Sequence, residues 1–147
     1  MLQTEKQQLR RCYREARRTL SSEEKRFIDC KISDNLLKSD LYRDAACIFC
    51  YVSTSDEIGT AAILEQALTD GKTLCVPLCG RAGEMSARRI LSLDELKSGA
   101  YGIPEPSSGA PTKFRSSLFL RSRATETATV SATEAVITIV FLPGPTL

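Results

Sequence analysis

Four basic residues near the start of the chain recur at a spacing suited to holding an anion. At 100° per residue of a helix they fall within an arc of about 80°, and they are Lys6, Arg10, Arg14 and Arg17. Lys and Arg side chains bind phosphates and carboxylates through charge-assisted hydrogen bonds. The plainer interpretation is a solvated face whose charges aid solubility. An excess of eight Lys/Arg over four Glu in residues 1–26 keeps the anion-binding hypothesis open.

A second candidate is Glu57, which follows the apolar run of residues 45–52. In an open α/β sheet, ligands bind beyond the carboxyl ends of the strands. A carboxylate at that position can accept hydrogen bonds from a ring nitrogen or an amino group of a ligand. The alternative is a surface acid that only supports the start of the next helix.

Six cysteines and the absence of histidine narrow the metal chemistry. The pairs Cys47/Cys50 and Cys75/Cys79 have spacings that resemble two halves of a zinc site. Positions three apart in a strand point to opposite faces, so Cys47 and Cys50 would not share a metal. The sequence therefore favours buried, reduced thiols, and no metal ligand is assigned.

Two amphipathic helices are expected ahead of the first strand. The first covers residues 4–20, and we expect its apolar stripe to dock on the domain beside the basic row; the stripe is Leu9, Tyr13, Ala16 and Leu20. The second begins at Ser21, because Ser21 and Glu24 have the spacing of a capping box. Its apolar stripe is Ile28, Ile32 and Leu36, and its periodicity ends at residues 38–40.

Residues 45–52 and 73–78 are apolar runs typical of strands buried on both faces. The helix between them would be capped by Thr60 and closed by Gly71. This strand–helix–strand order predicts parallel pairing, and hence an α/β fold with an open, mainly parallel, Rossmann-like sheet and flanking helices. Further elements are expected as a strand at 85–91, a short helix at 93–97 and a proline-fixed loop at 101–106.

The last third of the chain has a different character. Residues 107–133 are rich in Ser and Thr, which predicts a mobile, poorly packed segment. Residues 135–142 form an apolar run that we expect to be the last strand of a single domain over residues 1–147. With no later strand to cover it, this strand would leave an open, association-prone edge.

The composition, with 42% hydrophobic and 26% charged residues, is that of a globular domain. No run of 18 apolar residues predicts a membrane span, and no secretory signal is present. Glu5 and Glu15 disfavour a mitochondrial transit peptide, so a cytoplasmic protein is expected. The net charge of +2 requires no nucleic-acid partner.

Five short motifs occur in order within residues 6–106. The first is Lys6-x-x-Leu9-Arg10, followed by Arg14 and Arg17. The second is Tyr51-x-Ser53-x-x-Asp56-Glu57-Ile58, followed by Thr60. The others are Gly71-Lys72 before the run that contains Pro77, then Met85, then Gly99-x-Tyr101-Gly102-Ile103-Pro104-Glu105-Pro106. In this order and spacing they resemble the 5-formyltetrahydrofolate cyclo-ligases, or methenyltetrahydrofolate synthetases, and residues 139–144 continue the resemblance.

The resemblance implies a ring-forming ligase that uses ATP and Mg²⁺ to convert 5-formyltetrahydrofolate into 5,10-methenyltetrahydrofolate, ADP and phosphate. It implies folate contacts at Val52 and Glu57, and a monomer if the chain is complete. It assigns no catalytic residue. The implied ATP contacts are Lys6, Gln7, Gln8, Leu9 and Arg10.

The family's glycine-rich phosphate loop has no counterpart before Leu147, so we expect a chain truncated at its C-terminus. Two alternatives to an active enzyme follow. One is an inactive fragment that binds ATP or folate weakly. The other is a basic helical module that binds RNA or another polyanion, although a pI of about 8.2 speaks against it.

Overall fold

The structure, a computed structural model, describes residues 2–80, 85–99 and 102–107, and the backbone of 112–115, 126–132 and 135–143; side chains are described within residues 4–107. The helices are α1 (Leu2–Arg18), α2 (Ser22–Leu37), α3 (Asp40–Asp44) and α4 (Ala61–Thr69), with a 3-10 turn, η2 (Leu93–Glu95). The strands are β1 (Ala45–Phe49), β2 (Thr73–Cys79), β3 (Met85–Ile90), β4 (Leu96–Ser98), β5 (Pro104–Pro106), β6 (Thr112–Arg115), β7 (Glu126–Ala132) and β8 (Ala135–Pro143).

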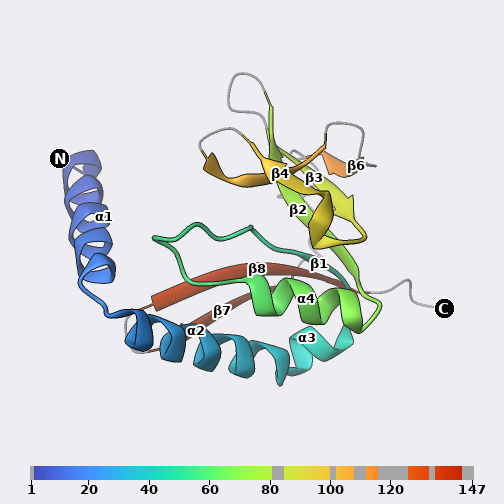
Figure 1. Cartoon of the computed structure of the whole chain (residues 1–147), viewed down its shortest axis with the longest axis horizontal. Coiled ribbons are helices and arrows are strands. Elements are labelled where there is room, and N and C mark those ends of the chain that lie inside the picture. Colours follow the sequence, from blue (N-terminus) through green and yellow to red (C-terminus); the bar gives the residue numbers. More distant parts are fainter. Residues whose placement is uncertain are drawn as a thin grey trace.

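Six strands form one sheet in the order β6-β3-β2-β1-β8-β7 (Figure 1). β1 and β2 are parallel, as the strand–helix–strand order predicted. The other pairings in this sheet are antiparallel. The predicted α/β class is confirmed, but the sheet is mixed rather than mainly parallel. A parallel pair needs a crossover connection, and among the described elements only α4 provides one between adjacent strands of the sheet.

The end of the chain differs most from the expectation. β8 lies inside the sheet, antiparallel to β1 on one side and to β7 on the other. The prediction that residues 135–142 present an open edge is therefore wrong. The Ser/Thr-rich segment 107–133 contains β6 and β7, which corrects the prediction of a poorly packed segment for those strands. The rest of that segment beyond residue 107 lies outside the described residues.

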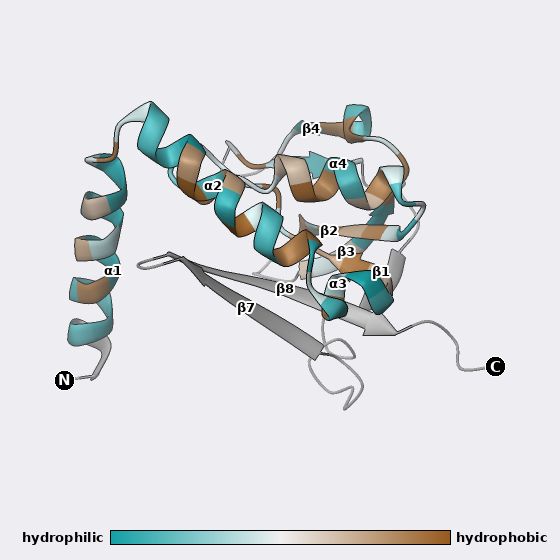
Figure 2. Ribbon diagram, turned by 90° about the horizontal axis from the view of Figure 1, so that it is seen from below, coloured by the Kyte–Doolittle hydropathy of each residue, from teal (hydrophilic) through white to brown (hydrophobic). Residues whose placement is uncertain are grey.

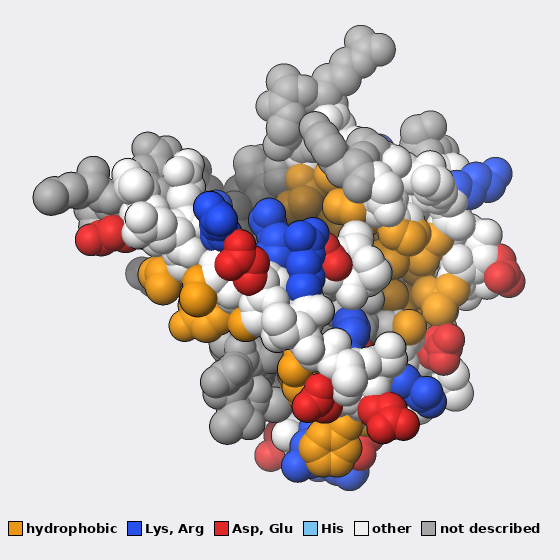
Figure 3. All heavy atoms as spheres, turned by 60° about the vertical axis from the view of Figure 1, so that its left-hand side comes forward, with side chains coloured by type: hydrophobic (Ala, Val, Ile, Leu, Met, Phe, Trp, Pro, Cys, Tyr) orange, Lys and Arg blue, Asp and Glu red, His pale blue; other side chains and the backbone are white. Residues whose placement is uncertain are grey.

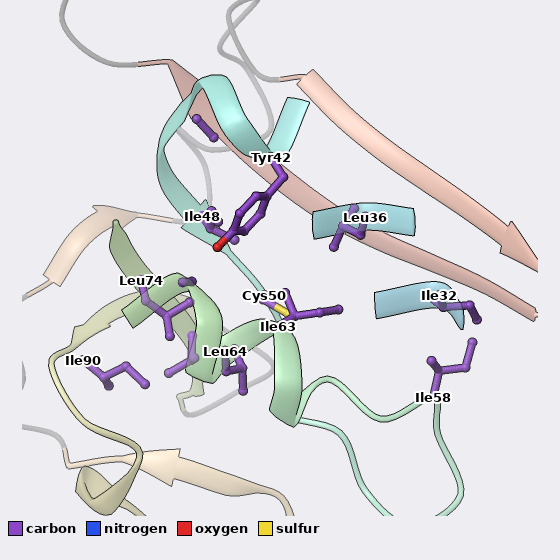
Figure 4. Close-up of a cluster of buried hydrophobic side chains, with 13 residues drawn as sticks. Ile32, Leu36, Tyr42, Ile48, Cys50, Ile58, Ile63, Leu64, Leu74 and Ile90 are labelled. Atoms are coloured by element: carbon purple, nitrogen blue, oxygen red, sulfur yellow. The ribbon is translucent and has the colours of Figure 1, made fainter. Parts of the chain in front are cut away.

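Helices α2, α3 and α4 lie together on one side of the sheet (Figure 2). Their apolar side chains meet those of the strands in one continuous cluster (Figure 4). Complete burial of a Leu or Ile side chain contributes about 1.5–3 kcal/mol, so these contacts hold the helices in place. The largest fully buried members are Ile32 and Leu36 of α2, Ile63 and Leu64 of α4, and Ile48, Leu74 and Ile90 of the strands.

The cysteines of β1 and its neighbours separate onto the two faces of the sheet. Cys50 belongs to the cluster under the helices. Cys47 belongs to a second cluster, formed with Cys75, Ala87 and Phe49. Their spacing predicted this separation, because side chains of a strand alternate between its faces. The two thiols therefore belong to different clusters rather than to one shared site.

Local signals explain where most elements begin and end. The predicted capping box of α2 is confirmed: Ser21 Oγ accepts from the Glu24 amide, and the Glu24 carboxylate accepts from the Ser21 amide. Gly71 ends α4 with a φ of 70°, which glycine adopts without strain. The sequence did not predict α3, whose start is capped by Ser39. The expected helix at 93–97 is only η2, and the expected loop at 101–106 contains β5, which pairs with β4.

Helix α1 stands at one end of the molecule, apart from the sheet (Figures 1 and 2). Its predicted docking on the domain is wrong, because Leu9 and Tyr13 are 56% and 54% exposed. The core is already covered by α2 and α4, and the turn at residues 19–21 directs α1 away from them. None of the helices in the described part of the chain is long and apolar enough to cross a membrane.

Candidate functional site

A cleft of about 410 Å³ opens between α1, α2 and the loop that follows β1. This size lies in the range of small-molecule sites, roughly 300–1,000 Å³. The C-terminal half of α1 forms one wall, the N-terminal half of α2 forms another, and residues 55–58 close the third side. The lining residues are Tyr13, Ala16, Arg17, Arg18, Leu20, Lys25, Phe27, Ile28, Asp29, Lys31, Ser55, Asp56, Glu57 and Ile58.

The loop after β1 is fixed by a reciprocal latch between Ser53 and Thr60. The Ser53 amide donates to Thr60 Oγ1 at 3.1 Å, and the Thr60 amide donates to Ser53 Oγ at 3.0 Å. Thr60 Oγ1 also donates to the carbonyl of Tyr51 at 2.9 Å. Thr60 occupies the N-cap position of α4, as predicted, but its hydroxyl makes no capping bond. It holds the loop instead.

Glu57 is oriented by its own turn. Its Oε2 atom accepts from the Thr54 amide at 2.9 Å and from the Thr54 hydroxyl at 3.2 Å. The second carboxylate oxygen, Oε1, takes no part in these two hydrogen bonds and belongs to a side chain that lines the cleft. Because one oxygen fixes the orientation, the other is available to a ligand at little entropic cost.

Tyr51 supports the same loop from below. Its hydroxyl donates to the carbonyl of Ile58 at 3.2 Å. Burial raises the pKa of this hydroxyl above its ordinary value, the charges of Cys50, Glu57 and Asp29 raise it further, and Arg17 opposes them. Tyr51 is therefore a neutral donor at physiological pH. Arg17, whose charge opposes this rise, lies on the α1 wall of the cleft.

One ion pair connects two walls of the cleft, and a second lies within the α2 wall. Arg18 of α1 donates to Asp56 of the loop at 3.0 Å. Lys25 and Asp29 pair along α2 at 2.7 Å. The first pair is largely exposed, and such pairs are worth about 0–1 kcal/mol. It therefore guides α1 over the loop without fixing it rigidly. Figure 3 shows basic side chains gathered beside carboxylates on this face.

The structure places the site residues predicted from the sequence in different parts of the molecule. Glu57 lines the cleft. Val52 is half-buried and packs against the core cluster just before the loop. The predicted ATP contacts are exposed on the N-terminal half of α1 and do not line the cleft: Lys6, Gln7, Gln8, Leu9 and Arg10. These assignments remain predictions, and the structure brings only Glu57 into the cleft.

Sequence reasoning missed the α2 wall. Lys25, Asp29 and Lys31 were not singled out, although Lys25 and Asp29 have the i, i+4 spacing of a helical ion pair. Arg17 was identified as part of the basic row, but its neighbours were not. The missing information is the angle between α1 and α2, which no periodicity within either helix encodes.

A buried acid braces the end of β2. Glu105, 7% exposed, accepts from the Cys79 amide at 3.1 Å. Its hydrogen bond to the Cys79 thiol raises the pKa of that thiol, and burial adds to the effect. The carboxylate lies so close to Gly99 that a Cβ there would stand 2.7 Å from its Cδ atom. A side chain at position 99 would therefore force the Glu105 side chain to move.

The described residues contain no group of three or more His, Cys, Asp or Glu side chains placed to hold a metal ion. Two of the three acids of the cleft are held in ion pairs, Asp56 by Arg18 and Asp29 by Lys25. The third, Glu57, is bonded to Thr54. The acids of the cleft therefore take part in hydrogen bonds and ion pairs within the protein.

Comparison with known proteins identifies what the chain is similar to. A sequence profile of the 5-formyltetrahydrofolate cyclo-ligase family matches residues 2–144. Among solved structures, the chain is similar to the NMR structure of a 5,10-methenyltetrahydrofolate synthetase from Aquifex aeolicus, with a TM-score of 0.64 and 28% sequence identity. The similarity covers 76% of this chain and 55% of that chain, so this chain spans little more than half the length of the protein it matches. No curated protein gave a match.

Proposed function

Because the chain belongs to the 5-formyltetrahydrofolate cyclo-ligase family, we propose that it serves the ATP-dependent closure of 5-formyltetrahydrofolate to 5,10-methenyltetrahydrofolate, with ADP and phosphate as the other products. The observation that carries this proposal is the position of Glu57. The residue expected to contact folate lines a cleft of suitable size, with its carboxylate already oriented.

The reaction explains why such a site needs binding more than acid–base groups. The formyl oxygen of the substrate is an amide oxygen and a poor leaving group. Transfer of the γ-phosphoryl group from ATP onto that oxygen makes it a good one. The neighbouring N10 then attacks the formyl carbon, which closes the ring. Phosphate departs with the oxygen, and N10 loses its proton to the departing phosphate or to water. The protein contributes mainly positioning and charge neutralisation, in line with a chain that has no histidine.

Within this scheme Glu57 binds the ring system of the folate. Its Oε1 atom accepts from an N–H group of the ring, while Thr54 holds Oε2. Val52 fixes the depth of the loop through its contact with the core. The latch between Ser53 and Thr60 keeps the loop from relaxing when the cleft is empty. The site is therefore preorganised, which lowers the entropic cost of binding.

ATP is assigned to the basic row of α1. Lys6 and Arg10 lie on this exposed helix, outside the cleft. Their charges are suited to phosphate groups. We place the nucleotide along α1, beside the folate rather than in the same pocket.

The resemblance also implies Mg²⁺. The described side chains form no group of three or more that fits a metal ion, and two of the three acids of the cleft are engaged in ion pairs. No residue of the cleft is therefore assigned to Mg²⁺.

Separate titrations of 5-formyltetrahydrofolate and of ATP, followed by calorimetry, test the assignment. Glu57→Gln should weaken folate binding about ten- to hundredfold and leave ATP binding within about twofold, because a hydrogen bond to a charged group is worth about 1.5–3 kcal/mol. The double variant Lys6→Ala/Arg10→Ala should do the reverse. Glu65→Gln, an exposed acid of α4 outside the cleft, is the matched control. Equal losses for both ligands in both variants would remove the assignment.

A further inference from the structure

The cleft contains two cations that no carboxylate of the described chain neutralises. Its four basic groups are Arg17, Arg18, Lys25 and Lys31, and its three acids are Asp29, Asp56 and Glu57. Two ion pairs, Arg18 with Asp56 and Lys25 with Asp29, engage four of these seven groups. The pairs leave Arg17 on the α1 wall, Lys31 on the α2 wall and Glu57 on the loop.

The Lys31 side chain is oriented by a contact with a neighbouring aromatic ring. Its Nζ atom lies 4.6 Å from the centre of the Phe27 ring, one helical turn earlier. Phe27 is 61% exposed, so this ring is a surface platform rather than a part of the core. A cation over an aromatic face is attracted by the negative face of the ring. The ammonium group is thus positioned at the rim of the cleft.

Arg17 interacts electrostatically with Tyr51, which supports the loop after β1. Its charge acts on the Tyr51 hydroxyl, as do the charges of Glu57 and Asp29. Arg17, Lys31 and Glu57 line one cleft, so a single ligand in it faces the carboxylate and both cations.

Apart from Ser55, the remaining lining is mainly apolar and includes Tyr13, Leu20, Ile28 and Ile58. A ligand complementary to this cleft has a ring with N–H donors, an apolar middle and two negative charges. A folate has this order of parts: a pterin ring, a benzoyl ring and a glutamate with two carboxylates. A nucleoside triphosphate, with about four negative charges and no need for Glu57, fits less well, because only two cations are unpaired.

We propose that Arg17 and Lys31 bind the two glutamate carboxylates of the folate, so that α1 and α2 select the tail of the substrate while the loop selects its ring. The inference rests on the proposed function. It adds that the walls of the cleft discriminate folates from tail-less pterins. Arg17 supplies a planar fork suited to one carboxylate, and Lys31 a point charge suited to the other.

Two ligands that differ only in the tail test this proposal: 5-formyltetrahydrofolate and 5-formyltetrahydropteroate, which lacks the glutamate. The wild-type chain should bind the folate at least tenfold more tightly. Arg17→Gln and Lys31→Gln should each weaken folate binding about tenfold and leave pteroate binding unchanged. The matched controls are Arg11→Gln and Lys38→Gln, because both side chains are exposed and lie outside the cleft. Neither control should change either affinity.

The outcomes separate this proposal from the proposed function. If the wild type binds folate and pteroate equally, or if the two variants weaken both ligands equally, the tail assignment is wrong while folate binding stands. If the variants weaken ATP instead, the two cations form a phosphate site and the assignment is overturned. If the wild type binds neither pterin ligand, the proposed function fails and the tail assignment fails with it. Thermal unfolding of each variant verifies that it is folded.

Discussion

Replacing Thr60 by valine should remove the side-chain hydrogen bonds that hold the loop carrying Glu57. Thr60 is fully buried, and its hydroxyl accepts from the Ser53 amide and donates to the Tyr51 carbonyl. Valine has nearly the same shape but no hydroxyl. Thr60→Val therefore leaves the Ser53 amide without its partner and leaves the Tyr51 carbonyl with the more distant Cys50 thiol, at 3.4 Å. The substitution creates no cavity, so the free-energy change reports the hydrogen bonds.

The magnitude follows from those two groups. A buried donor or acceptor left unsatisfied costs about 1–3 kcal/mol, so complete loss at both groups would cost roughly 2–6 kcal/mol. The Cys50 thiol lowers the share of the Tyr51 carbonyl. Because the Ser53 and Tyr51 groups are only half-buried, the loop can relax toward water, and we expect about 2–4 kcal/mol. In a domain of this size, 1 kcal/mol shifts the melting temperature by about 2–4 °C, which predicts a fall of roughly 5–15 °C.

Urea unfolding followed by circular dichroism measures this loss, and a folate titration measures its functional consequence. Thr60→Ser is the control, since it keeps the hydroxyl and loses one methyl group, at a cost of about 1 kcal/mol. Folate affinity should fall in Thr60→Val and persist in Thr60→Ser. Equal stability of Thr60→Val and the wild type within about 0.5 kcal/mol would refute the role of the latch.

Two further substitutions probe other parts of the fold. Gly99→Ala should destabilise the chain by about 1–3 kcal/mol through overpacking against Glu105. Chemical denaturation should show that most of this destabilisation disappears when Glu105 is also replaced by Ala. An unchanged destabilisation would contradict the clash. The hydrogen bond from Tyr42, and after it the bond from Gln66, lowers the pKa of Asp70 below its ordinary 3.8. The ionised Asp70 therefore stabilises the fold above pH 3.8, and this stabilisation is lost as the pH falls through the lowered pKa. In urea titrations, the difference in free energy of unfolding between the wild type and Tyr42→Phe should therefore be smaller at about pH 2 than at about pH 6. An equal difference at both pH values would contradict the role of this hydrogen bond.

Elements with strong local signals were predictable from the sequence. The capping box of Ser21 and Glu24 and the stripe of Ile32 and Leu36 define α2 without reference to the rest of the fold. The apolar run at β1, the turn at Gly71 and the run at β2 were enough to predict the parallel pair. In each case the physical determinant lies within one or two turns of the residues that it shapes.

Elements that depend on distant partners were not predictable. β7 is made of Thr, Ala and Ser with one Glu and one Val, a composition that carries no strong strand signal, and its structure depends on pairing with β8. The insertion of β8 beside β1 is a choice of partner that periodicity does not encode. Exposed Leu9 and Tyr13 looked like a docking face because helical periodicity cannot report that α2 and α4 already cover the core.

The candidate site shows the same division. Glu57 was predictable because it follows a buried strand in a fold class whose ligands bind at strand ends. Lys31 was not, since its place in the cleft depends on the angle between α1 and α2 and on its contact with Phe27. Sequence reasoning found the part of the site set by topology and missed the part set by helix orientation.

The central claim is that folate occupies the cleft between α1, α2 and the loop after β1. Titration of the isotope-labelled chain with 5-formyltetrahydrofolate, followed by amide chemical shifts, tests it most directly. We predict the largest shifts at residues 55–58 and at Arg17 and Lys31, which line the cleft, with small shifts in β4 and β5. Saturable shifts centred on β4 and β5, or none at residues 55–58, would contradict the account.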